Sequence, residues 1–388
     1  MIQQRFEQLV KNKKCTLLGV GPMSKNCVDV VIELANEHNA PLMLIASRRQ
    51  IDSEEFGGGY VNNWTTKEFA KYINDNDKRG KVILARDHGG PWQNELEKKQ
   101  NFGLRQAMES AKKSYKSDLD SGFDILHIDP SVDPYATPNV SEVLDRIYEL
   151  YDYCWSYAKQ IGRDIQFEIG TEEQSGSTNT SEELEYTLNE VIKFCEKRNF
   201  PKPMFVVVQT GTRVMEMKNV GSFDSPIRVV GELAAEVQVP MMIDICHRYG
   251  IMMKEHNTDY LSSDALKWHP RLGIHAANVA PEFGVAETCG ILEMIELTKQ
   301  NNLLEQFSTL VLESDKWKKW MLPNTKANEL DRVKIAGHYV FATPQFVEIK
   351  RQLEDKLQPK GIILDNILKQ KIRESILRYM SNFRLTKL

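Results

Sequence analysis

The stretch VILARDHGGPWQNE, residues 82–95, joins a hydrophobic run to a charged, glycine-rich one. Its first four residues, 82–85, are all apolar, which is typical of a strand covered on both faces. Arg86, Asp87 and His88 follow, and the GGP at 89–91 predicts a turn with no regular element. The stretch therefore predicts a buried strand that delivers a carboxylate and an imidazole to a shared pocket.

The same alternation recurs along the chain. Eight apolar runs lie at residues 15–20, 41–46, 81–85, 123–128, 164–169, 204–208, 250–253 and 272–279. Helix-sized amphipathic segments separate them, at 26–37, 65–74, 104–121, 141–160, 181–198 and 230–237. Strands that alternate with helices predict a parallel sheet, and eight such units within about 300 residues predict an α/β fold of the (β/α)8 type, a TIM barrel. A doubly wound open sheet is the alternative, weakened because GVGPMSK replaces a GxGxxG turn after the first strand.

We expect residues 1–300 to form the barrel and residues 301–388 to form a C-terminal helical extension packed on it. The 388 residues are 41% hydrophobic and 27% charged, with a formal net charge of -4. The sequence has no basic block that would predict nucleic acid as a partner. It also has no stretch that approaches the roughly 20 apolar residues of a membrane span. Six cysteines without a CxxC pair argue against a disulfide framework or a thiolate zinc site. These features predict a cytoplasmic protein.

Polar side chains follow most of the predicted strands. Because active sites of TIM barrels lie at the carboxyl ends of the strands, we expect these side chains to converge there. They are Ser47-Arg48-Arg49-Gln50, Asp87-His88, Asp129, Glu172, Gln209, His256 and Asn278, with His127 near the end of the fourth run and His275 within the eighth.

Two imidazoles and a carboxylate from separate strands match an open catalytic metal site. We predict His88, Glu172 and His256 as ligands, with Asp87 beside them to carry a proton. Strand alternation in FEIGTEE points Glu168 and Gly170 to one side, while the turn lets Glu172 face inward. We favour Glu172 as the ligand and interpret Glu168 as a structural partner. Because histidines are among the predicted ligands, magnesium is the less suitable metal. The spacing of the ligands along the sequence does not distinguish zinc from manganese, nickel or cobalt.

Structural alternatives exist for each candidate. Asp87 and His88 could cap the glycine turn, as Asp often does before glycine. His127 could be a buried histidine whose neighbour Asp129 caps the next turn, and His256 could be a surface loop residue. The glycine loop FGGGY at 56–60 could close over a ligand, and the Arg48-Arg49 pair could hold a phosphate.

The ordered motifs FGGGY, DHGGPWQ, GFDILHIDPS, EIGTEE, VVVQTG, EHNTDY and VAPEFG resemble the GatZ/KbaZ family. This family comprises the so-called non-catalytic subunits of class II tagatose-1,6-bisphosphate aldolase. The resemblance runs from about residue 15 to the C-terminus. The chain departs from the family pattern at Asn278, where the tagatose proteins have Lys, and at Arg48-Arg49, which replaces small polar residues.

The resemblance implies a TIM barrel of ketose-phosphate metabolism, and some relatives are metal-dependent ketohexose-phosphate 4-epimerases. We therefore predict an aldolase or 4-epimerase that uses a divalent metal, zinc by preference, with Asp87 and Asp129 as catalytic carboxylates. Substrate contacts are predicted for Arg48, Gln50, Gly58, His127, Gln209, Asp259 and Asn278. The alternative is a non-catalytic subunit that stabilises a separate class II aldolase, with Trp317 and Trp320 of the extension in the contact surface. A homo-oligomer is left open.

Overall fold

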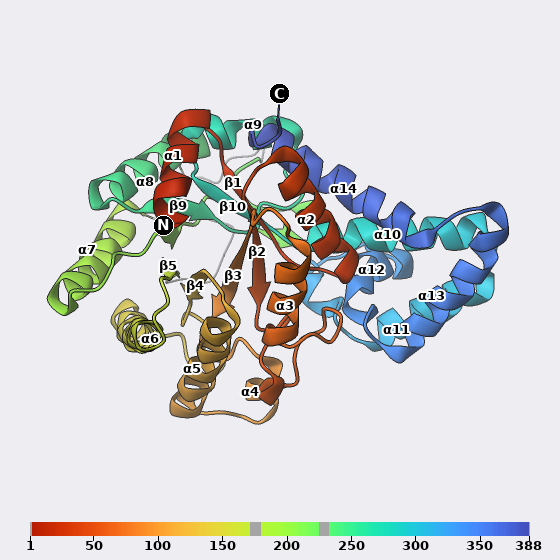
Figure 1. Cartoon of the computed structure of the whole chain (residues 1–388), viewed down its shortest axis with the longest axis horizontal. Coiled ribbons are helices and arrows are strands. Elements are labelled where there is room, and N and C mark those ends of the chain that lie inside the picture. Colours follow the sequence, from red (N-terminus) through yellow and green to blue (C-terminus); the bar gives the residue numbers. More distant parts are fainter. Residues whose placement is uncertain (1, 171–179, 225–232, 388) are drawn as a thin grey trace.

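Eight parallel strands close into a barrel in the computed structural model, which describes residues 2–170, 180–224 and 233–387 (Figure 1). The predicted (β/α)8 barrel is confirmed. The barrel order is β1-β10-β9-β6-β5-β4-β3-β2, and β7 and β8 form a separate antiparallel pair. The strands are β1 (Leu17–Val20), β2 (Leu42–Ser47), β3 (Val82–Gly89), β4 (Ile125–Ile128), β5 (Gln166–Ile169), β6 (Phe205–Val207), β7 (Val214–Met215), β8 (Lys218–Asn219), β9 (Met252–Glu255) and β10 (Ala276–Val279).

Helices surround the barrel and continue beyond it. Those up to the last strand are α1 (Ile2–Lys13), α2 (Lys25–His38), α3 (Thr66–Asn76), α4 (Glu95–Lys99), α5 (Leu104–Ser121), α6 (Val140–Gln160), α7 (Ser181–Arg198), α8 (Ala235–Tyr249) and α9 (Ser263–Leu272). After β10 come α10 (Pro281–Leu297), α11 (Asn301–Glu313), α12 (Glu329–Ala336), α13 (Pro344–Leu357) and α14 (Leu364–Asn382). Short 3₁₀ turns lie at Glu54–Phe56, Lys318–Trp320, Gly337–Val340 and Gln358–Lys360. None of the described helices is both long and apolar enough to cross a membrane.

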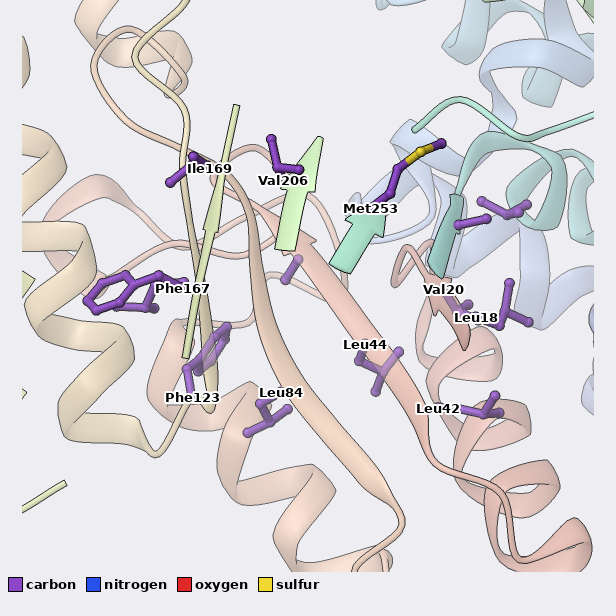
Figure 2. Packing of buried hydrophobic residues seen from close by; sticks show 14 of the residues in the cluster. Leu18, Val20, Leu42, Leu44, Leu84, Phe123, Phe167, Ile169, Val206 and Met253 are labelled. Carbon is purple, nitrogen blue, oxygen red and sulfur yellow. The ribbon is translucent and has the colours of Figure 1, made fainter. Parts of the chain in front are cut away.

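Strand alternation divides the core into two layers. Side chains that point outward, such as Leu44, Leu84 and Phe167, pack against the surrounding helices (Figure 2). A second apolar cluster contains alternate residues of the same strands, among them Met43 and Ile83. Phe6 of α1 belongs to this second cluster and contacts Phe205 with ring centroids 6.4 Å apart. Helix α1 therefore covers the amino-terminal end of the barrel.

The last helices form their own apolar cluster before the chain returns to the barrel. This cluster joins Ile291 and Ile295 of α10 to residues of α11 to α14. Helix α14 then packs against α10 and α2 (Figure 1), and its Arg378 forms an ion pair with Glu282 of α10 at 2.9 Å. The extension is helical, as predicted, while the division at residue 300 stays a prediction.

Helix α8 differs from its prediction. The expected segment stopped at residue 237, before Pro240, whereas the helix begins at Ala235 and runs through the proline to Tyr249. A proline inside a helix removes one backbone hydrogen bond and usually destabilises it. Here Val239, Met242 and Cys246 are buried on one face, and this burial outweighs the local cost.

Candidate metal centre and active site

At the carboxyl ends of the strands, the barrel interior is lined by polar instead of apolar side chains. Five barrel strands bring buried polar residues there: Asp87 (β3), His127 (β4), Glu168 (β5), Lys254 (β9) with His256 directly after that strand, and Asn278 (β10). His88 of β3 completes the group, with ring centroids 5.3 Å from His127 and 5.0 Å from His256. We refer to these seven residues as the polar cluster. The predicted convergence of strand-end residues is thus observed.

An irregularity in β3 brings two consecutive residues to this cluster. The sequence predicted that the strand ends before Asp87, but β3 continues to Gly89, and its register against β4 shifts between Arg86 and Gly89. Neighbouring residues of a regular strand point to opposite faces. Arg86 faces outward, with an ion pair to Asp118 at 2.5 Å, whereas His88 has a positive φ of 43° and lies 3.8 Å from the Asp87 carboxylate. The shift therefore turns His88 inward beside Asp87.

Asp129 orients His88. Its Oδ2 accepts a hydrogen bond from His88 Nδ1 at 2.6 Å, and its Oδ1 accepts one from the Ser131 hydroxyl at 2.5 Å. This arrangement leaves Nε2 of His88 facing the cluster, as in carboxylate–histidine pairs that support metal ligands. Both oxygens of the predicted catalytic Asp129 are engaged, so the structure places it behind His88 as a positioning residue.

Glu168 occupies the centre of the cluster. Its Oε1 lies 2.9 Å from His256 Nε2, and its Oε2 accepts a hydrogen bond from Lys254 at 2.6 Å. Burial raises the pKa of Glu168, but Lys254 and the two histidines outweigh burial and lower it to about 2. Phe167 faces outward and stacks on Tyr151, so alternation directs Glu168 inward. Glu172, which was predicted as the ligand in its place, lies outside the described residues.

The donor atoms suit a metal ion. Asp87, His127, Glu168 and His256 each offer one atom, and these four atoms lie within 4.8 Å of one another; the three histidines of the cluster form a second such set. Asp87 Oδ1 is 3.8 Å from His127 Nδ1 and 3.9 Å from His256 Nε2. Donors about 2 Å from a cation lie roughly 3–4 Å apart, so these separations fit. His127 belongs to both sets, and its Nδ1 also accepts the backbone N–H of His88 at 3.1 Å.

The charges of the cluster are strongly coupled. Burial lowers the pKa of His88, but the Asp87 and Asp129 carboxylates outweigh burial and raise it to about 9. Burial raises the pKa of Asp87, yet the surrounding histidines hold it well below its ordinary value. Asp87 is therefore ionised at neutral pH, which is the form that accepts a proton.

Asn278 fits the cluster because Gly19 on the neighbouring strand has no side chain. The Asn278 amide donates a hydrogen bond to Asp87 at 3.3 Å, and a Cβ on Gly19 would lie 2.2 Å from Asn278 Oδ1. That oxygen is buried and has no hydrogen-bond partner among the described residues. An unpaired acceptor beside ionised groups indicates a place where a ligand completes the hydrogen bonding.

A cavity of about 220 Å³ opens above Asp87 and His88. Gln50, Arg49 and Gln93 line it from the barrel side, together with Tyr60 of the glycine loop. The extension contributes the other wall, with Lys319, Trp320 and Tyr339. The candidate site is thus built from both parts of the chain.

Two of the predicted substrate contacts lie outside the lining of this cavity. Arg48 is buried and faces away from the cavity, with ion pairs to Asp52 at 2.9 Å and to Glu97 at 2.5 Å; its neighbour Arg49 lines the cavity. Asp259 accepts hydrogen bonds from the backbone N–H groups of Ala280 and Glu282, at 3.0 and 2.9 Å. Because these groups belong to the start of α10, Asp259 acts as a helix cap.

Other predicted residues divide between the cavity and its surroundings. Gln50 lines the cavity, while Gly58 does not; the backbone of Gly58 donates to Ser53 O at 3.1 Å instead. Gln209 is buried just beyond β6. His275 precedes β10, at the opposite end of the strand from the cluster, and contacts His247 at 3.2 Å. Lys254 was not predicted as a site residue, although the alternation of MMKEH aligns it with His256.

Known structures share this fold. A probable tagatose 6 phosphate kinase from Sinorhizobium meliloti superposes with a TM-score of 0.76 at 16% identity, covering 95% of this chain and all of that chain. Fructose-bisphosphate aldolase from Campylobacter jejuni gives a TM-score of 0.57 at 11% identity, over 99% of this chain and 94% of that chain. The fructuronate-tagaturonate epimerase UxaE from Cohnella laeviribosi gives 0.56 at 11% identity, over 98% and 86%. At these identities the likeness establishes the fold alone. No protein-family model matches the chain.

Proposed function

We propose that this chain is a divalent-metal-dependent enzyme that acts on a ketose phosphate by a retro-aldol reaction, as an aldolase or a C4 epimerase. The polar cluster carries this proposal, because it joins two imidazole donors, two ionised carboxylates and a cavity at the carboxyl ends of the barrel strands. The fold match to an aldolase and to an epimerase supports this reaction class. Membership of the GatZ/KbaZ family is part of the same proposal.

His256, His127 and Glu168 would hold the cation, with Asp87 beside them and His88 as a further imidazole donor from the second set; Glu172 stays a candidate from the sequence. Zinc is preferred, and manganese, cobalt or nickel also suit two imidazoles with a carboxylate. A bound divalent cation supplies polarisation of the C2 carbonyl and stabilisation of negative charge at its oxygen. Lys254 fixes one oxygen of Glu168 and leaves the other facing the histidines.

Asp87 would accept the proton of the C4 hydroxyl as the C3–C4 bond breaks. The electron pair of that bond passes into the C2 carbonyl, and C4 leaves as an aldehyde. Release of the aldehyde, with the proton returned to C3, gives an aldolase, whereas re-addition to its opposite face, with the proton returned to the C4 oxygen, gives a 4-epimer. Asn278 donates to Asp87 and so holds this carboxylate in place.

Incubation of the purified protein with tagatose and fructose phosphates in the presence of zinc, manganese, cobalt or nickel tests this function. NMR of the products separates cleavage from epimerisation. We expect turnover that disappears after chelation and returns when the metal is restored. Full activity after thorough chelation contradicts the metal requirement, and the absence of any turnover contradicts the catalytic function.

The alternative is a non-catalytic subunit for a separate aldolase. Trp320 lines the cavity, and Trp317 packs against the apolar cluster of the extension. Both tryptophans are partly exposed, and their place in a contact surface stays a prediction. Co-expression with a class II aldolase followed by co-purification tests the alternative directly.

A further inference from the structure

Two cations at the cavity lack the carboxylate partners that their neighbours have. Arg49 follows β2, and Lys319 lies in the 3₁₀ turn Lys318–Trp320 of the extension; both are exposed and both line the cavity. Within the described part of the chain, neither side chain has a carboxylate within 4.0 Å. Arg49 has one weak contact, to Gln93 Oε1 at 3.4 Å.

Adjacent basic residues are neutralised. Lys316 pairs with Glu95, the carboxylate on the same side of the cavity, and Lys318 pairs with Asp315 at 2.7 Å. Arg48, next to Arg49, is held by two buried carboxylates. Among the described residues that line the cavity, the unpaired positive charges are therefore those of Arg49 and Lys319.

Aromatic contacts hold Lys319 at the cavity. Its Nζ lies 4.9 Å from the ring centroid of Trp320 and 5.0 Å from that of Tyr339, and such contacts are favourable for a cation. The Trp320 indole donates to the Tyr339 hydroxyl at 3.2 Å, and the Trp320 carbonyl accepts a hydrogen bond from Glu216 at 2.7 Å. This segment is thereby tied to both the extension and the β7–β8 pair.

We propose that Arg49 and Lys319 form an anion subsite that binds the charged terminal group of the substrate, remote from the reacting carbons. The inference rests on the proposed function, because it treats the polar cluster as the reaction centre. A guanidinium and an ammonium suit a phosphate, and they also suit the carboxylate of a uronate. The helical extension thus takes a direct part in substrate selection.

Calorimetric binding to the metal-loaded protein tests the subsite without requiring turnover. The probes are tagatose 1,6-bisphosphate, tagaturonate and uncharged tagatose, and the variants are Arg49→Gln and Lys319→Ala. We expect each variant to weaken binding of a charged sugar about tenfold, a typical value for a lost charge-assisted contact. Metal content and Tm should not change. If the variants weaken binding of tagatose 1,6-bisphosphate, the subsite binds a phosphate; if they weaken binding of tagaturonate, it binds a carboxylate.

Lys318→Ala is the matched control, because Lys318 is adjacent and exposed but already paired. It should bind all probes as the parent does. Equal loss of charged and uncharged sugars, or unchanged binding in both variants, overturns the subsite. Unchanged binding together with normal turnover would leave the proposed function intact, whereas selective weakening without turnover would support the subsite and contradict the catalytic role.

Discussion

Asp87 and His88 are adjacent in the chain but have different expected chemistry. His88→Ala removes a proposed metal ligand, so the metal should bind at least about tenfold more weakly. Asp87→Asn keeps the shape but cannot accept a proton, so turnover should fall by about 10²–10⁴-fold while the metal is retained. Metal analysis, Tm and NMR turnover on both variants check this. Loss of metal from Asp87→Asn would instead make Asp87 a ligand.

Arg48 and Arg49 allow a second comparison between neighbours. Arg48→Met leaves the carboxylates of Asp52 and Glu97 buried without their cation. Breaking such a pair costs about 3–5 kcal/mol, so we expect a strongly reduced free energy of unfolding. Arg49→Gln should change it by less than about 0.5 kcal/mol, because Arg49 is exposed. Urea denaturation measures both, and an unchanged stability in Arg48→Met would contradict the structural role.

At the scale of elements, β1 and β10 meet through Gly19 and Asn278. Gly19→Ala would place a methyl group 2.2 Å from Asn278 Oδ1, and overpacking of this kind typically costs about 1–3 kcal/mol. We expect a lower Tm and a displaced Asn278, visible as weaker metal binding in calorimetry. Gly103→Ala is the control, since a Cβ there meets nothing within 4 Å. Equal behaviour of the two variants would contradict the packing argument.

The strands could be predicted from the sequence because apolar runs of four to eight residues between helix-sized segments are typical of buried strands. The details of the site depend on local features that hydrophobic periodicity does not predict. The register shift at His88 is one such feature, since regular alternation would have pointed this side chain away from Asp87. The choice between Arg48 and Arg49 is another, because it depends on Glu97, which is distant in the chain, meeting Arg48 together with the nearby Asp52. Alternation alone, applied strictly, would have selected Glu168.

On the scale of the whole molecule, a buried histidine couples the extension to pH. His338 contacts Tyr339 and lies against Gly284 of α10; burial and Lys319 lower its pKa to about 3. As pH falls, His338 is therefore protonated at a higher pH in the unfolded chain than in the folded chain. His338 contributes stability that is fully present above pH 6.5 and is lost between pH 6.5 and 3, amounting to about 2 kcal/mol by pH 5.

We expect His338→Gln to show a shallower loss of stability than the parent between pH 7 and pH 5. Denaturation curves at each pH give the two slopes, and their difference isolates the contribution of this side chain from that of other titrating groups. Parallel slopes would mean that His338 is not protonated on unfolding in this range.

The apolar layer beneath the polar cluster, which includes Phe6, bears on how a ligand enters and leaves the cavity. With that end of the barrel filled, a ligand of the polar cluster would enter and leave through the cavity between the barrel and the extension. In the proposed reaction, a fragment formed by cleavage would leave past Arg49 and Lys319. A charged terminus that stays bound there would detain the fragment beside its reaction partner. The time that the fragment stays bound at this subsite would then decide whether the two products of cleavage separate or recombine.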